Sequence, residues 1–233
     1  VKDFFQKTIK SKNLESRTKN YYVNNKDRKN YIFNATLNGI EESDLILLIG
    51  TNPRYEATIL NTKIRKSYLK NKTDIYSFGA IGDLTYPYKV LDNKTDTIRD
   101  IIENKNDLTE KIKSAKKPLI LIGQSALKLQ AGKYIFEELK KFLIQNNKIS
   151  NDWNALNIIS NHASTVGGYD LDILDLNEKD TTLEKIKKNY FEILFLFGQD
   201  SFDFKKKDEF IVYIGSHGDS GAELADVILP GSA

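Results

Sequence analysis

Cysteine and methionine are both absent from this 233-residue sequence, and it contains only two histidines, His162 and His217. Without thiolates, the chain can form no disulfide, no CxxC redox pair and no cysteine-ligated iron–sulfur cluster. Two imidazoles also disfavour a zinc or copper site of the usual composition. Any such chemistry must therefore reside on another polypeptide. Because methionine is missing and the sequence opens on Val1, we expect a fragment, a trimmed chain or a processed one.

Long apolar runs and a strong charge imbalance are missing as well. No run approaches the roughly 18 apolar residues of a membrane span, and the first ten residues lack the hydrophobic region of a secretory signal. The 35 Lys and Arg nearly balance the 32 Asp and Glu, and acidic residues flank the longest basic run, 205–207. A solvated loop accounts for that run. We therefore expect no direct membrane span and no nucleic-acid partner.

Short apolar runs that end in glycine are the most informative pattern present. Seven runs of strand length occur, at residues 45–49, 75–78, 119–122, 156–159, 193–197, 210–214 and 227–229. Five of them stop directly at a glycine, namely Gly50, Gly79, Gly123, Gly198 and Gly215. Nearly continuous apolar strands are typical of parallel sheets that are covered on both faces.

Amphipathic segments separate several of these runs. Apolar residues recur at helical spacing in 54–70 and 131–145, and Thr181 with Glu184 predicts a capping box. The alternation predicts an α/β fold, a doubly wound, mostly parallel sheet with helices on both faces. The link 198–210 is barely long enough for a helical crossover, so we expect a departure from the regular pattern there. We predict an irregular basic arm at 1–26 and one α/β domain, incomplete at its C-terminus, at 27–233.

The stretch LLIGTNPRYEA, from Leu47, is typical of an apolar strand that turns into a helix. Such a turn lies at the carboxyl end of a strand, where glycine lets a ligand approach the backbone and helix N–H groups face an anion. Three turns offer small and hydrogen-bonding residues for this purpose. The candidate positions are Gly50, Thr51, Asn52, Gly123, Gly215, His217 and Asp219. Neither GxGxxG nor GxxxxGK[ST] occurs, which disfavours NAD or ATP binding by those mechanisms.

The segment SHGDSG places His217 two residues before Asp219, as a general base and its orienting group require. No serine elbow or cysteine nucleophile accompanies the pair. Local hydrogen bonding within a glycine-rich turn is therefore the interpretation that we favour. We interpret His162 as a cap or a partly buried residue, and Trp153 as a core or interface residue.

The order of these motifs resembles the carboxyl-terminal, molybdopterin-oxidoreductase-like part of the largest (75 kDa) peripheral-arm subunits of respiratory complex I, the NADH:ubiquinone oxidoreductase. The resemblance runs from about residue 27 to residue 233. It rests on a succession of short motifs: RKNY from Arg28, GIEESD from Gly39, LLIGTNPRYEA from Leu47, IRKS from Ile64, DLTY from Asp83, AKKPLILIGQSAL from Ala115, DW from Asp152, LFLFG from Leu194 and HGDSGAELADVILPG from His217.

The resemblance implies a non-catalytic scaffold domain that supports electron transfer from NADH to quinone. Molybdopterin-dependent enzymes hold a guanine dinucleotide cofactor at these strand ends, whereas the complex I subunits keep the architecture without that cofactor. The candidate turns would then be a vestigial pocket, with no catalytic residue and no metal in this chain. Iron–sulfur clusters are expected on the missing amino-terminal part of the subunit or on a partner chain. The implied partners are other peripheral-arm subunits, on the matrix side of the mitochondrial inner membrane.

Two alternatives stay open at this point. The first is a fragment of an active oxidoreductase that depends on molybdopterin guanine dinucleotide, in which the glycine turns bind the cofactor. The second is a nucleotide-binding regulatory module without redox chemistry.

Overall fold

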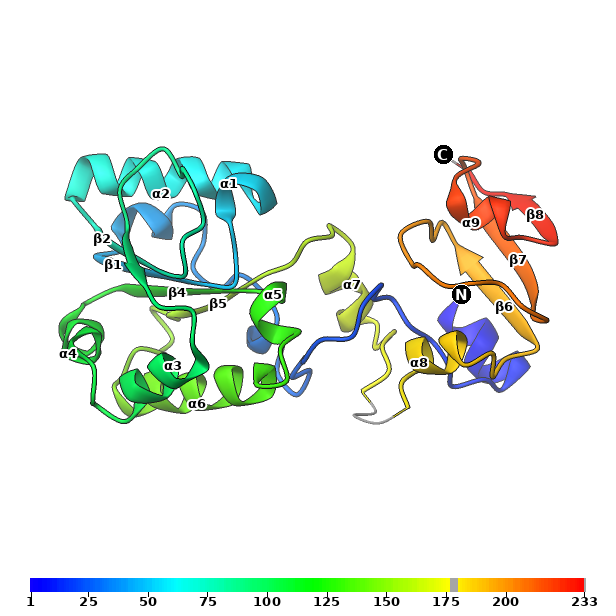
Figure 1. Cartoon of the computed structure of the whole chain (residues 1–233), viewed down its shortest axis with the longest axis horizontal. Helices are drawn as coiled ribbons and strands as arrows, with labels where there is room; N and C mark the ends of the chain where they lie inside the picture. Colours follow the sequence, from blue (N-terminus) through cyan, green and yellow to red (C-terminus); the bar gives the residue numbers. More distant parts are fainter. Residues whose placement is uncertain (177–179, 233) are drawn as a thin grey trace. The chain divides into compact units, whose positions relative to one another are not determined.

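The computed structural model describes residues 1–176 and 180–232, which form two compact units (Figure 1). The larger unit is residues 21–167, and the smaller one combines residues 1–20 with 168–233. This division differs from the predicted arm at 1–26 and single domain at 27–233, because the first twenty residues pack with the last third of the chain. Whether 27–233 behaves as one domain stays a prediction.

The larger unit is built on a five-stranded parallel sheet with the strand order β3-β2-β1-β4-β5. β1 lies at the centre, in register with β2 from Leu45 opposite Asp74 and with β4 from Leu45 opposite Pro118. The strands are β1 (Leu45–Ile49), β2 (Asp74–Phe78), β3 (Lys89–Leu91), β4 (Pro118–Gly123) and β5 (Leu156–Ile159). The helices are η2 (Arg28–Asn30), η3 (Gly39–Glu42), α1 (Pro53–Glu56), α2 (Thr58–Asn71), α3 (Thr95–Ile102), α4 (Asp107–Ser114), α5 (Gln124–Leu127) and α6 (Gly132–Gln145). A further helix, α7 (Thr165–Asp170), spans the boundary between the units.

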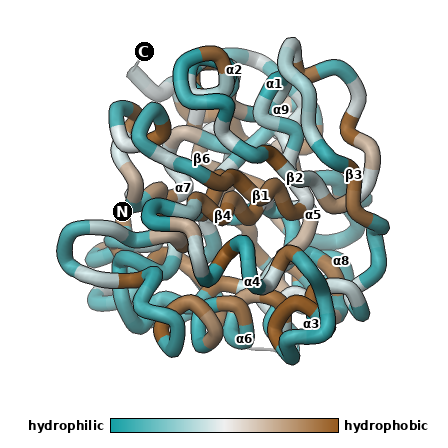
Figure 2. Tube along the Cα trace, turned by 90° about the vertical axis from the view of Figure 1, so that its left-hand side faces the viewer, coloured by the Kyte–Doolittle hydropathy of each residue, from teal (hydrophilic) through white to brown (hydrophobic). Residues whose placement is uncertain are grey.

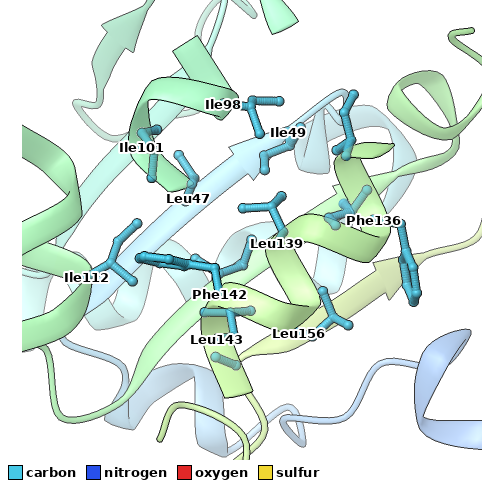
Figure 3. Packing of buried hydrophobic residues seen from close by; sticks show 14 of the residues in the cluster. Leu47, Ile49, Ile98, Ile101, Ile112, Phe136, Leu139, Phe142, Leu143 and Leu156 are labelled. Atoms are coloured by element: carbon cyan, nitrogen blue, oxygen red, sulfur yellow. The ribbon is translucent and has the colours of Figure 1, made fainter. Parts of the chain in front are cut away.

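Helices cover both faces of this sheet, because alternate residues of its strands point to opposite sides. Ile46 and Leu48 of β1 pack with Ile64 of α2 on one face. Leu47 and Ile49 pack on the other face with residues of α3, α4 and α6. Figure 3 shows this second cluster, and Figure 2 shows the apolar β1 and β4 in the interior. The predicted doubly wound α/β architecture is confirmed.

Two details of the larger unit differ from the sequence prediction. The predicted helix 54–70 is interrupted at Ala57, whose backbone (φ −152°, ψ 70°) separates α1 from α2. Alanine has the highest helix propensity, and Ala57 continues the helical spacing of apolar residues, so the sequence does not indicate the break. The short strand β3 also escaped prediction, because Lys89 and Val90 are exposed and no apolar run marks it. The predicted helix 131–145 is confirmed as α6.

The smaller unit contains a three-stranded parallel sheet with the order β6-β7-β8. Its elements are η1 (Phe4–Ile9), α8 (Thr182–Lys187), β6 (Ile193–Phe197), β7 (Phe210–Gly215), α9 (Ser220–Glu223) and β8 (Val227–Pro230). The Thr181 side chain accepts a hydrogen bond from the Glu184 N–H at 3.2 Å, which confirms the Thr181 half of the predicted capping box, while the Glu184 carboxylate accepts from Asn20 at 3.4 Å. Within the link 198–209, all of which the structure describes, no helix occurs between β6 and β7, as the shortness of the link suggested.

The first residues of the chain are part of the smaller unit's core rather than irregular throughout. The ring of Phe5, in η1, is buried and lies 5.1 Å from the ring of Phe195 and 5.9 Å from that of Phe197, both edge-on. Arg17 and Glu15 form an ion pair at 2.7 Å whose side chains are about 95% buried. In the described part of the chain, no helix combines the length and the apolar character that crossing a bilayer requires.

Candidate functional site

The predicted site residues fall into two groups, one in each unit. In the larger unit, Gly50, Thr51 and Asn52 follow β1, and Gly123 is the last residue of β4. In the smaller unit, Gly215 is the last residue of β7, and His217 and Asp219 follow it.

In the larger unit, a carboxylate of the chain itself occupies the turn after β1. The Thr51 hydroxyl donates to Glu56 Oε2 at 2.8 Å, and the backbone N–H of Asn52 donates to Glu56 Oε1 at 3.1 Å. Thr51 is 3% exposed. These are two of the donors that an anionic ligand at this turn would need. Glu56 satisfies both and adds a negative charge at the same place, so this turn does not fit the phosphate groups of a molybdopterin nucleotide.

The glycines of this group are required by contact between the two turns. A Cβ atom at Gly123 would lie 2.2 Å from the carbonyl oxygen of Gly50, and one at Gly50 would lie 2.5 Å from the backbone nitrogen of Ala126. Gly50 also has φ +60°, a conformation that favours glycine. The glycine frame therefore packs one backbone against another, and no ligand is needed to explain it.

Asn52 and its neighbours hold the start of α1 in place. The Asn52 side chain accepts from the Arg54 N–H at 3.1 Å and donates to the carbonyl oxygen of Ile81 at 2.8 Å. The Arg54 guanidinium reaches the Asp83 carboxylate at 2.7 Å. The backbone N–H of Thr85, followed by that guanidinium, holds the pKa of Asp83 below its ordinary value. These contacts tie the turn to the loop after β2.

In the smaller unit, the turn after β7 is organised around a buried tyrosine. The Tyr213 hydroxyl lies 3.0 Å from Asp200 Oδ2 and 3.1 Å from the carbonyl oxygen of His217. Asp200 Oδ1 accepts from the Gly221 N–H at 2.8 Å. Burial, and then the Asp200 carboxylate, raise the pKa of the Tyr213 hydroxyl. A Cβ atom at Gly215 would lie 2.5 Å from this hydroxyl, so the glycine makes room for the tyrosine.

His217 and Asp219 do not form a hydrogen-bonded pair in the described structure. His217 Nδ1 lies 2.9 Å from Ser216 Oγ, and both His217 and Asp219 are exposed. Asp219 precedes α9, and its side chain does not cap that helix. A base with an orienting group is therefore not assembled here, although the absence of a catalytic role stays a prediction.

The remaining two residues singled out by the sequence have simple surroundings. His162 is exposed, so its interpretation as partly buried is wrong, and its carbonyl oxygen accepts the Thr165 N–H at 3.2 Å. Trp153 packs against both apolar clusters of the larger unit and donates from Nε1 to the Pro118 carbonyl oxygen at 2.8 Å. Across residues 1–176 and 180–232, no group of three or more His, Asp or Glu side chains could hold a metal ion.

Sequence reasoning missed Glu56, Asp200 and Tyr213. Glu56 lies within LLIGTNPRYEA, five residues after Thr51. At this separation the first turn of a helix can bring a side chain back to the residues that precede the helix. Tyr213 lies on the same face of β7 as Ile211, in the same apolar cluster. Its position in an apolar run does not indicate that its hydroxyl contacts Asp200. The signal for Glu56 was therefore present, and that for the other two was not.

Comparison with known proteins yields one family and a consistent set of relatives. A family model described as molybdopterin oxidoreductase matches residues 1–233. The chain is 43% identical over 215 residues to the NADH-ubiquinone oxidoreductase 75 kDa subunit of Reclinomonas americana, covering 91% of the chain and 31% of that protein. It is 39% identical to the mitochondrial 78 kDa subunit of Candida albicans, over 88% of the chain and 28% of that protein. It is 35% identical to an NADH-quinone oxidoreductase subunit of Rickettsia bellii, over the whole chain and 33% of that protein. The chain thus spans about a third of the length of these curated relatives.

Proposed function

We propose a scaffold role for this chain, which belongs to the molybdopterin oxidoreductase family: it is a structural domain of a peripheral-arm subunit of respiratory complex I. In this role it supports electron transfer from NADH to quinone and carries no redox centre. The relatives named as NADH-ubiquinone and NADH-quinone oxidoreductase subunits support the assignment to this enzyme.

The observation that carries the scaffold role is the internal occupation of the turn after β1. Glu56 accepts hydrogen bonds from the Thr51 hydroxyl and the Asn52 N–H. An incoming phosphate would have to displace a carboxylate that already holds both donors, and it would meet that carboxylate's charge at short range. We therefore propose that Gly50, Thr51, Asn52 and Gly123 are vestigial pocket positions that bind no cofactor.

The partners and the location follow from the proposed assembly. The partners are other peripheral-arm subunits and the part of the subunit that bears iron–sulfur clusters, since this chain has no cysteine. The location is the matrix side of the mitochondrial inner membrane, and the relative from Candida albicans carries the word mitochondrial in its name.

Isolation of the native assembly through an affinity tag on this chain tests the proposal. We expect the tag to recover NADH:quinone oxidoreductase activity and polypeptides that hold iron–sulfur clusters. An assembly with neither would contradict the proposed function. The same purification from cells in which the chain carries no tag supplies the control, because any activity or cluster recovered there is background.

The two alternative functions predict different measurements on the same assembly. An active molybdopterin enzyme would contain molybdenum or tungsten in a stoichiometric amount, which metal analysis detects. A regulatory nucleotide site would bind guanine or adenine nucleotides saturably in equilibrium dialysis. The Glu56 contacts favour neither, because they leave the turn after β1 with a carboxylate where either ligand would place a phosphate.

A further inference from the structure

Helix α2 has an outward face that carries cations and exposed apolar side chains but no carboxylate. The helix lies on one face of the five-stranded sheet (Figure 1), toward which it turns Leu60 and Ile64. At about 3.6 residues per turn, Ile59 and Leu69 fall on the opposite side, where they are 65% and 59% exposed. The basic residues of the helix are Lys63, Arg65, Lys66 and Lys70, and it contains no Asp or Glu.

The other long helices of the same unit contain acidic residues, and each forms an ion pair within the helix. In α3, Arg99 pairs with Asp96 at 3.1 Å. In α4, Lys113 pairs with Glu110 at 2.9 Å, and in α6, Lys141 pairs with Glu138. These pairs join residues three positions apart on solvated faces, which is the ordinary arrangement. An acid-free outward face is therefore particular to α2 among these four helices.

One carboxylate from outside the helix contacts only two of these four cations. Glu41 in η3 lies 2.7 Å from Lys63 and 2.9 Å from Lys66. The hydrogen bonds from these two lysines lower the pKa of Glu41 to about 2. Among the described residues, Arg65 and Lys70 have no ion pair, and both are exposed. At about 100° per residue, Arg65 lies about 40° from Leu69 around the helix axis and Lys70 about 20° from Ile59. The two cations without an ion pair therefore lie at the two edges of the outward face.

We propose that the outward face of α2, formed by Ile59, Arg65, Lys66, Leu69 and Lys70, docks an acidic segment of a neighbouring protein subunit. The proposal rests on the proposed function, since it assumes an assembly. The partner segment presents Asp or Glu side chains to Arg65 and Lys70 and apolar side chains to Ile59 and Leu69. Paired cations at the rim would fix orientation, and the two apolar side chains would be removed from water.

Zero-length coupling of amines to carboxylates in the native assembly, followed by mass spectrometry, tests this surface. We expect Lys66 or Lys70 to become joined to an Asp or Glu of another polypeptide. Lys113 and Lys141 serve as matched controls and should join only to Glu110 and Glu138 of their own helices. Lys70 that couples only within its own chain, and reacts with an amine reagent as fully in the assembly as in the free chain, would overturn the proposal.

Charge reversal supplies an independent measurement. The variant Arg65→Glu with Lys70→Glu should lower the fraction of the chain found in the assembly by about tenfold, and Arg65→Lys with Lys70→Arg should retain it. Both side chains are exposed, so the denaturant midpoint of the free chain should stay unchanged in both variants. Equal incorporation of the two variants would contradict the proposal.

Measurements on the native chain separate this proposal from the proposed function, and the charge-reversed variant separates it from binding to a membrane surface. A chain that enters an assembly without NADH:quinone activity, yet couples through Lys70 to a partner carboxylate, refutes the function and supports the docking surface. A chain that enters the active assembly, but whose α2 lysines react with the amine reagent as fully as in the free chain, supports the function and refutes the docking surface. Flotation of the free chain with vesicles of phosphatidylserine and phosphatidylcholine, abolished by the charge reversal, would show that a lipid surface is bound instead and would overturn the proposal.

Discussion

The carboxylate of Glu56 lies 2.8 Å from the hydroxyl of Thr51, five residues earlier in the chain and 3% exposed. The same carboxylate accepts the Asn52 N–H. The glycine and the hydroxyl of this turn suggest a ligand site, but a side chain of the same chain, Glu56, accepts the hydrogen bonds that a ligand would need.

Replacement of Glu56 by alanine should destabilise the larger unit. The change leaves the buried Thr51 hydroxyl and the Asn52 N–H without their acceptor, at a cost of about 1–3 kcal/mol for each buried group that stays unsatisfied. Urea unfolding followed by circular dichroism measures the loss. Glu110→Ala is the control, because it removes a carboxylate whose side chain is 76% exposed and should change the free energy of unfolding by less than about 0.5 kcal/mol. Equal effects would contradict the role given to Glu56.

Replacement of Gly50 by valine should lower the amount of assembled complex, through loss of stability. Its φ of +60° adds about 1–3 kcal/mol of backbone strain for a branched residue. The close contact with Ala126 adds overpacking of about 1–3 kcal/mol more. Gly82→Val is a matched control, since Gly82 has φ +79° and a Cβ atom there would meet nothing within 4 Å. The difference between the two variants in unfolding free energy isolates the contact, and identical losses would show that the contact does not matter.

Replacement of His217 by alanine should leave NADH:quinone turnover per assembled complex nearly unchanged. The imidazole is exposed, its Nδ1 lies beside Ser216 Oγ, and it has no hydrogen bond to Asp219 in the described structure. Turnover is normalised to complex quantified on native gels. A tenfold fall, about 1.4 kcal/mol of activation free energy, with normal assembly would give this loop a role in the reaction.

The Glu41 carboxylate should make stability depend on pH in the acidic range. Lys63, then Lys66, lower its pKa in the folded chain from 4.5 to about 2. A carboxyl group with a lowered folded pKa contributes stability above its unfolded pKa, and that contribution is lost as the pH falls from about 4.5 toward about 2. Glu41→Gln should therefore differ from the native chain more at pH 6 than at pH 2.5. Urea midpoints at the two pH values measure this, and a difference independent of pH would contradict it.

Residue patterns predicted the fold wherever burial acts on both faces of a strand. The run from Leu45 to Ile49 had to be a covered parallel strand, because five consecutive apolar residues leave no solvent face. The interruption at Ala57 was not predictable, because it leaves no gap in the helical spacing of apolar residues. Strand β3 was not predictable either, because it is exposed and contains no apolar run. The division into two units was not predictable either, because it depends on Phe5 meeting Phe195 far along the chain.

The candidate site was predicted as a set of turns but not as a set of contacts. Glycine at the end of an apolar run marks the turn: Gly50 directly follows β1, and Gly123 and Gly215 are the last residues of β4 and β7. The hydrogen bonds of each turn depend on side chains outside the turn itself. Some, such as Glu56, come from the next few residues, and others, such as Asp200, come from a different segment of the chain. Spacing within one motif does not encode the second kind of contact.

The smaller unit combines residues 1–20 with residues 168–233, which are separated in the chain by the larger unit. Its two parts are therefore translated at different times. Phe5 leaves the ribosome long before Phe195 and Phe197 exist, and at about 5–20 residues per second the wait is on the order of ten seconds or more. The larger unit, residues 21–167, is complete within that interval and can fold first. During this interval the ring of Phe5 lacks its two partners Phe195 and Phe197, so this part of the smaller unit can complete its packing only after β6 has been translated.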